Sequence, residues 1–93
     1  MIPLHTGRVL KRELSALELS ANKLALALRL QSGRITEILG GKRGVSADTA
    51  LRLGRYFGNS TRFWLSLQTA YELAVAERDI GDKVAREVET SAA

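Results

Sequence analysis

The 93-residue sequence contains no cysteine, one histidine and one proline. Without cysteine, the chain has no disulfide, no thiolate nucleophile and no cysteine-ligated zinc site. The single histidine, His5, has no histidine or cysteine neighbour with which to form a metal site, and no Ser–His triad can be assembled around it. We therefore expect a structural role for His5, no catalytic residues, no metal and no cofactor.

Long apolar runs are also missing. No segment approaches the roughly 18–20 apolar residues of a membrane span, and the first residues lack the apolar core of a signal peptide. With 45% apolar and 26% charged residues, the chain has the composition of one small folded domain. Because a core of this size is modest, a second subunit would add stability. We expect a cytoplasmic protein without a membrane partner.

Charge is distributed unevenly along the chain. Residues 1–66 hold eleven basic and four acidic residues, a balance of +7, whereas residues 67–93 hold three basic and six acidic residues, a balance of −3. The basic segment suits a polyanion such as nucleic acid, and the acidic segment suits a basic protein or simply solvent. Basicity alone does not identify a ligand, since many small basic proteins bind no particular anion.

The apolar pattern predicts five helices and no strand, because no run alternates apolar and polar residues for long enough. The helices are expected at about 7–16, 21–28, 32–39, 47–57 and 61–79. Ser20, Ser46 and Ser60 directly precede three of them and can cap them, and Ser32, the first residue of the third, is also expected to act as a cap. Gly40-Gly41 ends the third helix. The first helix is indicated by the i, i+4, i+7 spacing of Leu10, Leu14 and Leu17, and residues 90–93 are expected to form a loose tail.

The second and third expected helices have the spacing of a helix-turn-helix. Ala25 is small enough for close approach, and apolar residues would hold the two helices together: Leu24, Leu28, Leu30, Ile35 and Ile38. The outer face of the third helix carries short or hydrogen-bonding side chains that suit base edges in a major groove: Gln31, Ser32, Gly33, Thr36 and Glu37. Arg29 occupies the turn, where glycine is usual, and a left-handed arginine costs about 1 kcal/mol. An ordinary helical hairpin is the alternative.

Five side chains around this face are candidates for contacts with DNA. Asn22 and Lys23 begin the second helix, where backbone N–H groups bind phosphates, although a simple helix cap would also explain them. Arg34 points partly outward and could contact the backbone or a guanine. Lys42 and Arg43 lie in the loop after the third helix, where they could clamp a phosphate or be solvated. Two arginines of the fourth helix are interpreted as plain surface charges: Arg52 and Arg55.

The last expected helix, 61–79, is apolar on more than one side. Its aromatic residues Phe63, Trp64 and Tyr71 are more typical of a core than of a ligand site. A lone surface helix needs an apolar stripe of only about 100°, so the excess predicts burial against a second subunit. We expect a homodimer with Leu65 and Val75 in its interface.

The stretch ITEILGGKRGVSADTALRLGRYFGNSTRFWLSLQTAYEL, residues 35–73, resembles the HigA-type antitoxins. These are the virulence-associated protein I branch of the phage-repressor-like helix-turn-helix proteins. The resemblance extends from about residue 5 to 88 and is closest at 35–39, 42–44, 47–53, 63–65 and 67–68. The sequence departs from the family at His5-Thr6-Gly7, where His-Pro-Gly is usual, and at Arg8, where an acid is common. It also departs at three helix-turn-helix positions, which prevents transfer of a target sequence: Arg29, Gln31 and Gly33.

The resemblance implies an all-α, five-helix phage-repressor-like domain over residues 1–89. The helix-turn-helix would cover about 21–39, and the C-terminal helix, about 61–79, would serve dimerisation. The resemblance also implies an antitoxin of a type II pair, which neutralises a RelE-like, HigB-type mRNA endonuclease and represses its own operon by binding operator double-stranded DNA as a homodimer. Two alternatives stay open: a stand-alone transcriptional regulator without a toxin, and a protein-interaction module that has lost its operator.

Overall fold

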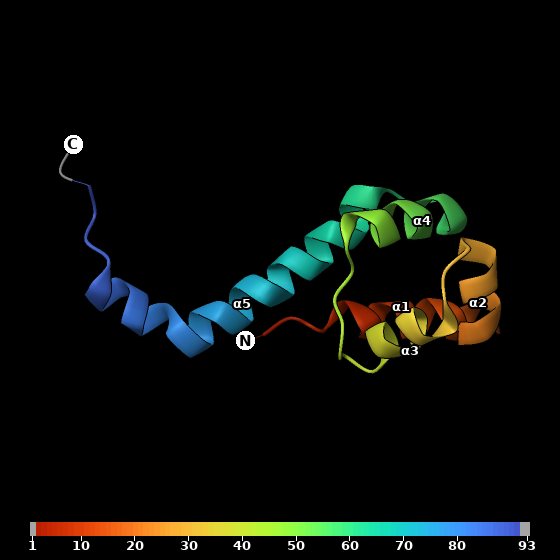
Figure 1. Cartoon of the computed structure of the whole chain (residues 1–93), viewed down its shortest axis with the longest axis horizontal. Helices are drawn as coiled ribbons and strands as arrows, with labels where there is room; N and C mark the ends of the chain where they lie inside the picture. Colours follow the sequence, from red (N-terminus) through yellow and green to blue (C-terminus); the bar gives the residue numbers. More distant parts are fainter. Residues whose placement is uncertain (1, 92–93) are drawn as a thin grey trace.

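The computed structural model of the chain describes residues 2–91, which form five helices and no strand. The helices are α1 (Thr6–Ala16), α2 (Ala21–Leu28), α3 (Ser32–Leu39), α4 (Ala47–Phe57) and α5 (Thr61–Glu87). The first four pack with the start of α5 into a body, and the rest of α5 extends away from it (Figure 1). The described chain is therefore elongated, at 52 × 24 × 21 Å. The prediction of an all-α fold is confirmed.

The bounds of α2, α3 and α4 agree with the sequence pattern, but α5 is longer than expected. It runs to Glu87 rather than to about residue 79. Gly81 does not end the helix, because one interior glycine costs only about 1 kcal/mol and Lys83, Ala85 and Arg86 favour helix. Residues 90–91 of the predicted tail lie outside any helix, and residues 92–93 fall outside the part of the chain that the structure describes.

Most of the predicted caps are present. Three serines accept a hydrogen bond from the backbone N–H three residues later: Ser20, Ser46 and Ser60. The prediction for Ser32 was wrong, because Ser32 is the first residue of α3 and Gln31 occupies the cap position without a side-chain bond. His5 has the structural role expected of it, since its Nδ1 accepts from the Gly7 N–H at 2.9 Å and caps α1.

The core lies where the five helices meet. Its buried apolar residues are Leu10, Leu14, Leu24, Ala25, Leu28, Ile35, Ile38, Val45, Ala50, Leu53 and Trp64. Trp64 is fully buried, and its indole N–H donates to Asn59 Oδ1 at 2.8 Å, so no polar group of the ring is left unpaired. Leu17, which the spacing grouped with Leu10 and Leu14, is exposed. The helix ends at Ala16 and Glu18 adopts a left-handed φ of 51°, so the chain turns and Leu19 packs against the core instead.

A buried glutamine joins the loop after α3 to α5. Gln68 is only 6% exposed, and its Oε1 accepts from the Val45 N–H at 2.9 Å, while its Nε2 donates to Glu72 Oε1 at 2.9 Å. The loop comes so close that a Cβ at Gly44 would overlap the Gln68 amide. The position of this loop is therefore determined by a side chain of α5.

Replacing Gln68 by methionine should destabilise the fold. Methionine has a similar length but no amide, so the buried Val45 N–H loses its acceptor. Such a group costs about 1–3 kcal/mol, and the free energy of unfolding in urea should fall by that amount. The double variant Gln68→Glu/Glu72→Gln is the matched control, because it retains an acceptor for Val45 and a complementary neighbour. A Gln68→Met variant as stable as the parent would contradict this role.

Candidate nucleic-acid interface

The turn between α2 and α3 is closed by an arginine in the left-handed conformation. Arg29 has φ 61° and ψ 41°, the conformation that glycine adopts most easily. The Leu30 N–H donates to the Ala25 carbonyl at 2.9 Å across this residue, which is the bond that ends many helices. The two helices then pack around Ala25, which is 1% exposed. The tight turn forms although it contains no glycine.

The position of α3 is further set by direct backbone contact with α1. A Cβ at Gly7 would overlap the carbonyl oxygen of Ile38. No side chain can therefore stand at position 7 without moving α3. Ile35 and Ile38 are fully buried beneath the helix, so α3 is held from below while its opposite face points to solvent.

That opposite face carries the predicted base-reading residues, all of them exposed: Gln31, Ser32, Gly33, Thr36 and Glu37. The Thr36 hydroxyl donates to the Ser32 carbonyl at 2.9 Å. Its hydrogen is thereby committed to the backbone, and its oxygen can only accept from a ligand. A Cβ at Gly33 would meet nothing within 4 Å, so the backbone of α3 is open to close approach there.

Two of the predicted arginines converge beside α3. Arg34 and Arg43 line a hollow of about 350 Å³ together with Gly44 and the first turn of α4, which contributes Ser46, Asp48 and Thr49. We call it the arginine hollow. Two guanidinium groups at the N-terminal end of a helix form a favourable site for an anion such as phosphate.

The pKa of one acid inside the arginine hollow is lowered by its neighbours. Arg52 Nε donates to Asp48 Oδ1 at 2.6 Å, and this bond lowers the pKa of Asp48, with smaller contributions from the charges of Arg52 and Arg34. A carboxyl whose pKa is lowered on folding stabilises the fold above its ordinary range, and the contribution is lost as pH falls below about 4. At neutral pH, Asp48 therefore offsets part of the positive charge of the hollow.

A second acid on this surface is paired with Arg43. Arg43 Nη2 lies 3.5 Å from Glu37 Oε1, with both side chains 46% exposed. Exposed pairs of this kind contribute about 0–1 kcal/mol, so Arg43 can exchange Glu37 for a phosphate at little cost. The sequence placed both residues near the reading face but did not show that they neutralise each other.

The remaining predicted contacts are exposed and separate from the arginine hollow. Asn22 and Lys23 lie in the first turn of α2, and Lys42 lies in the loop after α3. The Lys23 N–H already donates to Ser20 Oγ at 3.1 Å. The backbone group expected to bind phosphate at Lys23 is thus used by the cap, which leaves the Asn22 and Lys23 side chains as the available groups.

Arg52 is not the plain surface charge that the sequence indicated. Besides its bond to Asp48, its Nη1 donates to the Leu28 carbonyl at 2.8 Å. Arg52 therefore ties α4 to the last residue of α2, directly before the strained turn at Arg29. The spacing of Asp48 and Arg52, four residues apart on one helix, was the available signal. Arg55 is exposed, in agreement with the prediction.

Arg52 and Arg55 form a matched pair for testing this role. Arg52→Ala removes a charge-assisted bond to the end of α2, so the free energy of unfolding should fall by about 1–2 kcal/mol. Arg55→Ala removes the same kind of side chain from the same helix and should change the free energy of unfolding by less than about 0.5 kcal/mol. Urea denaturation measures both. Equal stability of the two variants would restore the interpretation of Arg52 as a surface charge.

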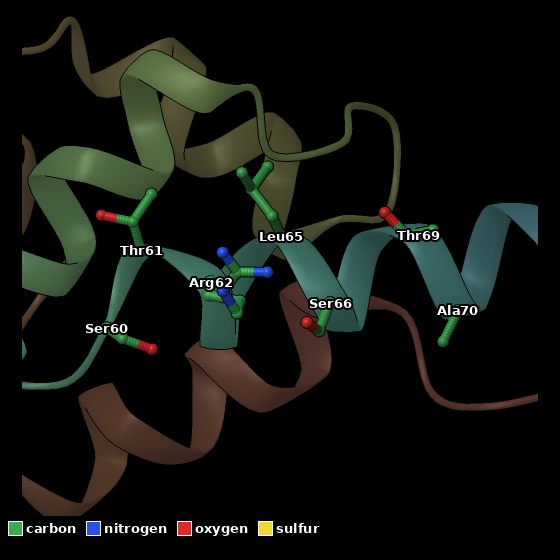
Figure 2. A pocket seen from close by; sticks show the side chains of 7 residues that line it. All are labelled: Ser60, Thr61, Arg62, Leu65, Ser66, Thr69 and Ala70. Atoms are coloured by element: carbon green, nitrogen blue, oxygen red, sulfur yellow. The ribbon is translucent and has the colours of Figure 1, made fainter.

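The two residues expected in a dimer interface lie on α5 and are half-buried within the chain. Leu65 packs against the core, and Val75 has intermediate exposure. The large exposed apolar residues of α5 beyond its first turn are Leu73, Ile80 and Val84, and Val88 directly follows the helix. Leu65 also borders a shallow hollow of about 800 Å³, shown in Figure 2 and lined by Ser60, Thr61, Arg62, Leu65, Ser66, Thr69 and Ala70. We call it the α5 hollow.

Between residues 2 and 91, no group of three or more His, Asp or Glu side chains is placed to hold a metal ion. None of the helices in that range combines the length and apolar character needed to cross a bilayer.

Comparison with known proteins identifies relatives over nearly the whole chain, although no protein-family model matches it. The chain is 50% identical over 80 residues to virulence-associated protein I of Dichelobacter nodosus, covering 85% of this chain and 74% of that protein. It is also similar to an addiction-module antidote protein of the HigA family from Coxiella burnetii, with 44% identity and a TM-score of 0.93 over 98% of this chain and 100% of the other. The Pseudomonas aeruginosa antitoxin HigA with the higBA promoter has 41% identity and a TM-score of 0.90, covering 94% and 96% of the two chains.

Proposed function

Because this chain belongs to the HigA-type antitoxins of the helix-turn-helix class, we propose that it is an antitoxin that also represses transcription by binding operator DNA. The observation that carries the DNA-binding part is the convergence of Arg34 and Arg43 on the N-terminus of α4, beside the exposed polar face of α3. The structure of a relative with promoter DNA supports it. The similar structures are antitoxins rather than enzymes, as the sequence predicted.

In the proposed complex, α3 lies in the major groove and reads base edges. Gln31 can donate and accept at once, which suits the N6 and N7 positions of adenine. Thr36 offers only an acceptor and a methyl group, so it suits an exocyclic amine of adenine or cytosine, or the methyl group of thymine. The Ser32 hydroxyl can donate to or accept from a base edge, and Gly33 leaves room for the helix to approach the bases.

Phosphate contacts would set the register of α3 in the groove. We assign them to five side chains: Asn22, Lys23, Arg34, Lys42 and Arg43. Two subunits on a palindromic operator would place their α3 helices about one helical turn of DNA apart. If these side chains together neutralise three or four phosphates per subunit, a homodimer bound in this way would make about six to eight phosphate contacts.

This count predicts the salt dependence of binding. Each neutralised phosphate contributes roughly −0.9 to the slope of log K against log salt, so the parent protein should show a slope of about −5 to −7 in fluorescence anisotropy titrations. The double variant Lys42→Ala/Arg43→Ala should weaken operator and random DNA equally and make the slope shallower. An unchanged slope would remove the loop from the interface.

Gln31→Ala is the matched control for that experiment. It removes a base contact but no charge, so operator affinity should fall by about 1–3 kcal/mol, with little change in random DNA binding or in the salt slope. Equal losses on both DNAs would show that Gln31 does not read sequence.

We further propose that the chain acts as a homodimer and neutralises a basic RelE-like, HigB-type toxin, as its membership of an antitoxin family supports. Co-expression with the adjacent reading frame tests this part. The toxin should co-purify with the tagged chain in a fixed ratio, and its expression alone should arrest growth. Operator binding without a co-purifying neighbour, and without growth arrest, would instead support a stand-alone regulator.

A further inference from the structure

Glu37 is the acid on the exposed face of α3, and the DNA contacts proposed above do not include it. Its side chain is 46% exposed, and its Oε1 lies 3.5 Å from Arg43 Nη2. The neighbours of a residue on a helix surface stand three and four positions away. For Glu37 they include Gly33 and Gly40, which have no side chain. The Glu37 carboxylate therefore protrudes past the glycines before and after it.

The groups around Glu37 on this face are mainly acceptors. The Thr36 hydroxyl donates its hydrogen to the Ser32 carbonyl, so its oxygen can only accept. Directly after α3, the N–H groups of residues 40–42 donate to carbonyls of the same helix, at 3.0, 3.1 and 2.9 Å. Apart from the cations assigned to phosphates, this end of the face thus presents acceptors to a base edge. At the other end, Gln31 can both donate and accept.

A carboxylate on a surface that meets DNA weakens binding unless its charge is compensated. In the free chain, Arg43 offsets the charge of Glu37. When Arg43 turns to a phosphate, as proposed above, the Glu37 carboxylate faces the major groove without this partner. Like charges brought together in an interface lower the affinity. Binding then keeps its full strength only where the DNA supplies a hydrogen-bond donor to Glu37.

Cytosine is the base that supplies such a donor best. In the major groove, cytosine presents its N4 amine and no acceptor, whereas adenine presents an N6 amine beside the N7 acceptor. Guanine presents two acceptors, and thymine presents an acceptor and a methyl group. A carboxylate accepts from an amine and is repelled by the lone pair of an acceptor. The expected order of preference is therefore cytosine, then adenine, then thymine and guanine.

We infer that Glu37 makes cytosine the preferred base at one position of each operator half-site, because its carboxylate accepts from the N4 amine and is repelled by the acceptors of other bases. The inference rests on the proposed function and adds a specificity-determining residue to the same surface. Gln31 and Glu37 are separated along the helix axis by about 9 Å, which spans between two and three base pairs of about 3.4 Å each. The two side chains therefore read different base pairs when α3 follows the groove.

A base-substitution series tests this inference. The operator is located by footprinting the chain on its own promoter, and each base pair is then replaced symmetrically in both half-sites. In fluorescence anisotropy, the parent should prefer cytosine to guanine at one position by about fivefold or more per half-site, the lower end for a base-specific contact. Glu37→Ala should lose this preference and keep the others. Glu37→Gln should shift it toward adenine, whose N6 and N7 an amide can contact.

A base analogue isolates the hydrogen bond itself. At the position so identified, pyrimidin-2-one replaces cytosine, which removes the N4 amine and keeps the ring. The parent should lose about fivefold or more in affinity per half-site beyond the loss that Glu37→Ala shows, because any weakening of the duplex is common to both proteins and cancels in the cycle. Equal losses for the two proteins would show that Glu37 does not bind this amine and would overturn the inference.

Three control variants separate base selection from a general effect of charge. Glu77→Gln removes the same charge from an exposed position of α5 and should leave every base preference unchanged. Gln31→Ala should lose the preference at its own base pair and keep the one for cytosine. Arg43→Ala should weaken binding to all DNA alike and also keep the cytosine preference. Loss of that preference in Arg43→Ala would show that Glu37 acts only by positioning Arg43, and the inference would be wrong.

The outcomes distinguish this inference from the proposed function. A parent chain without sequence-specific DNA binding would refute the proposed repressor, and the inference with it. Specific binding in which Glu37→Ala and Glu37→Gln retain every base preference would refute the inference alone, even if both variants bind all DNA more tightly. Because Glu37 is exposed, both variants should keep the helical content of the parent in circular dichroism. A changed base preference then reports binding and not folding.

Discussion

The hydrogen bond between Gln68 and the Val45 N–H connects α5 to the loop between α3 and α4. It holds the loop after α3, which carries Lys42 and Arg43 and leads into the N-terminus of α4, against the first half of α5. Because both groups are buried, neither regains a water partner unless the loop leaves the body, which makes the bond costly to break. The arginines that we propose contact DNA therefore share one rigid frame with α5.

The features that the sequence predicted are those that depend on neighbours along the chain. The bounds of α2, α3 and α4 follow from apolar spacing and from caps three residues away, and the exposed face of α3 follows from its periodicity. The bonds of Gln68 to Val45 and of Arg52 to Leu28 join residues 23 and 24 positions apart. The pattern of neighbouring residues along the chain does not predict pairs so far apart in the sequence. The length of α5 was underestimated because its last part does not pack against the body. Its residues therefore form no apolar stripe whose end would mark the end of the helix.

The acids beside the surface that we propose binds DNA have a consistent arrangement. Glu37 lies on α3 and Asp48 in the first turn of α4, and each is paired with an arginine, Arg43 and Arg52 respectively. One pairing is loose and half-exposed, so its arginine can move to a ligand. The other includes a bond to the backbone of α2, so its arginine is fixed. Two similar ion pairs thus differ in role: Arg43 is available to a ligand, whereas Arg52 is held in place. The difference comes from the bond that Arg52 makes to the Leu28 carbonyl.

The order of the body and the exposed part of α5, residues 73–87, along the chain has a consequence for the order of assembly. Every buried side chain of the body precedes Glu72, and chains emerge from the ribosome with their N-terminal parts free to fold first. The body can be complete while residues 73–87 are still being synthesised. Folding would then be a first-order event within one nascent chain, whereas pairing of two chains in the proposed homodimer would be second-order. The rate at which functional dimer appears would therefore depend on how many finished chains are present, and the rate at which each body folds would not.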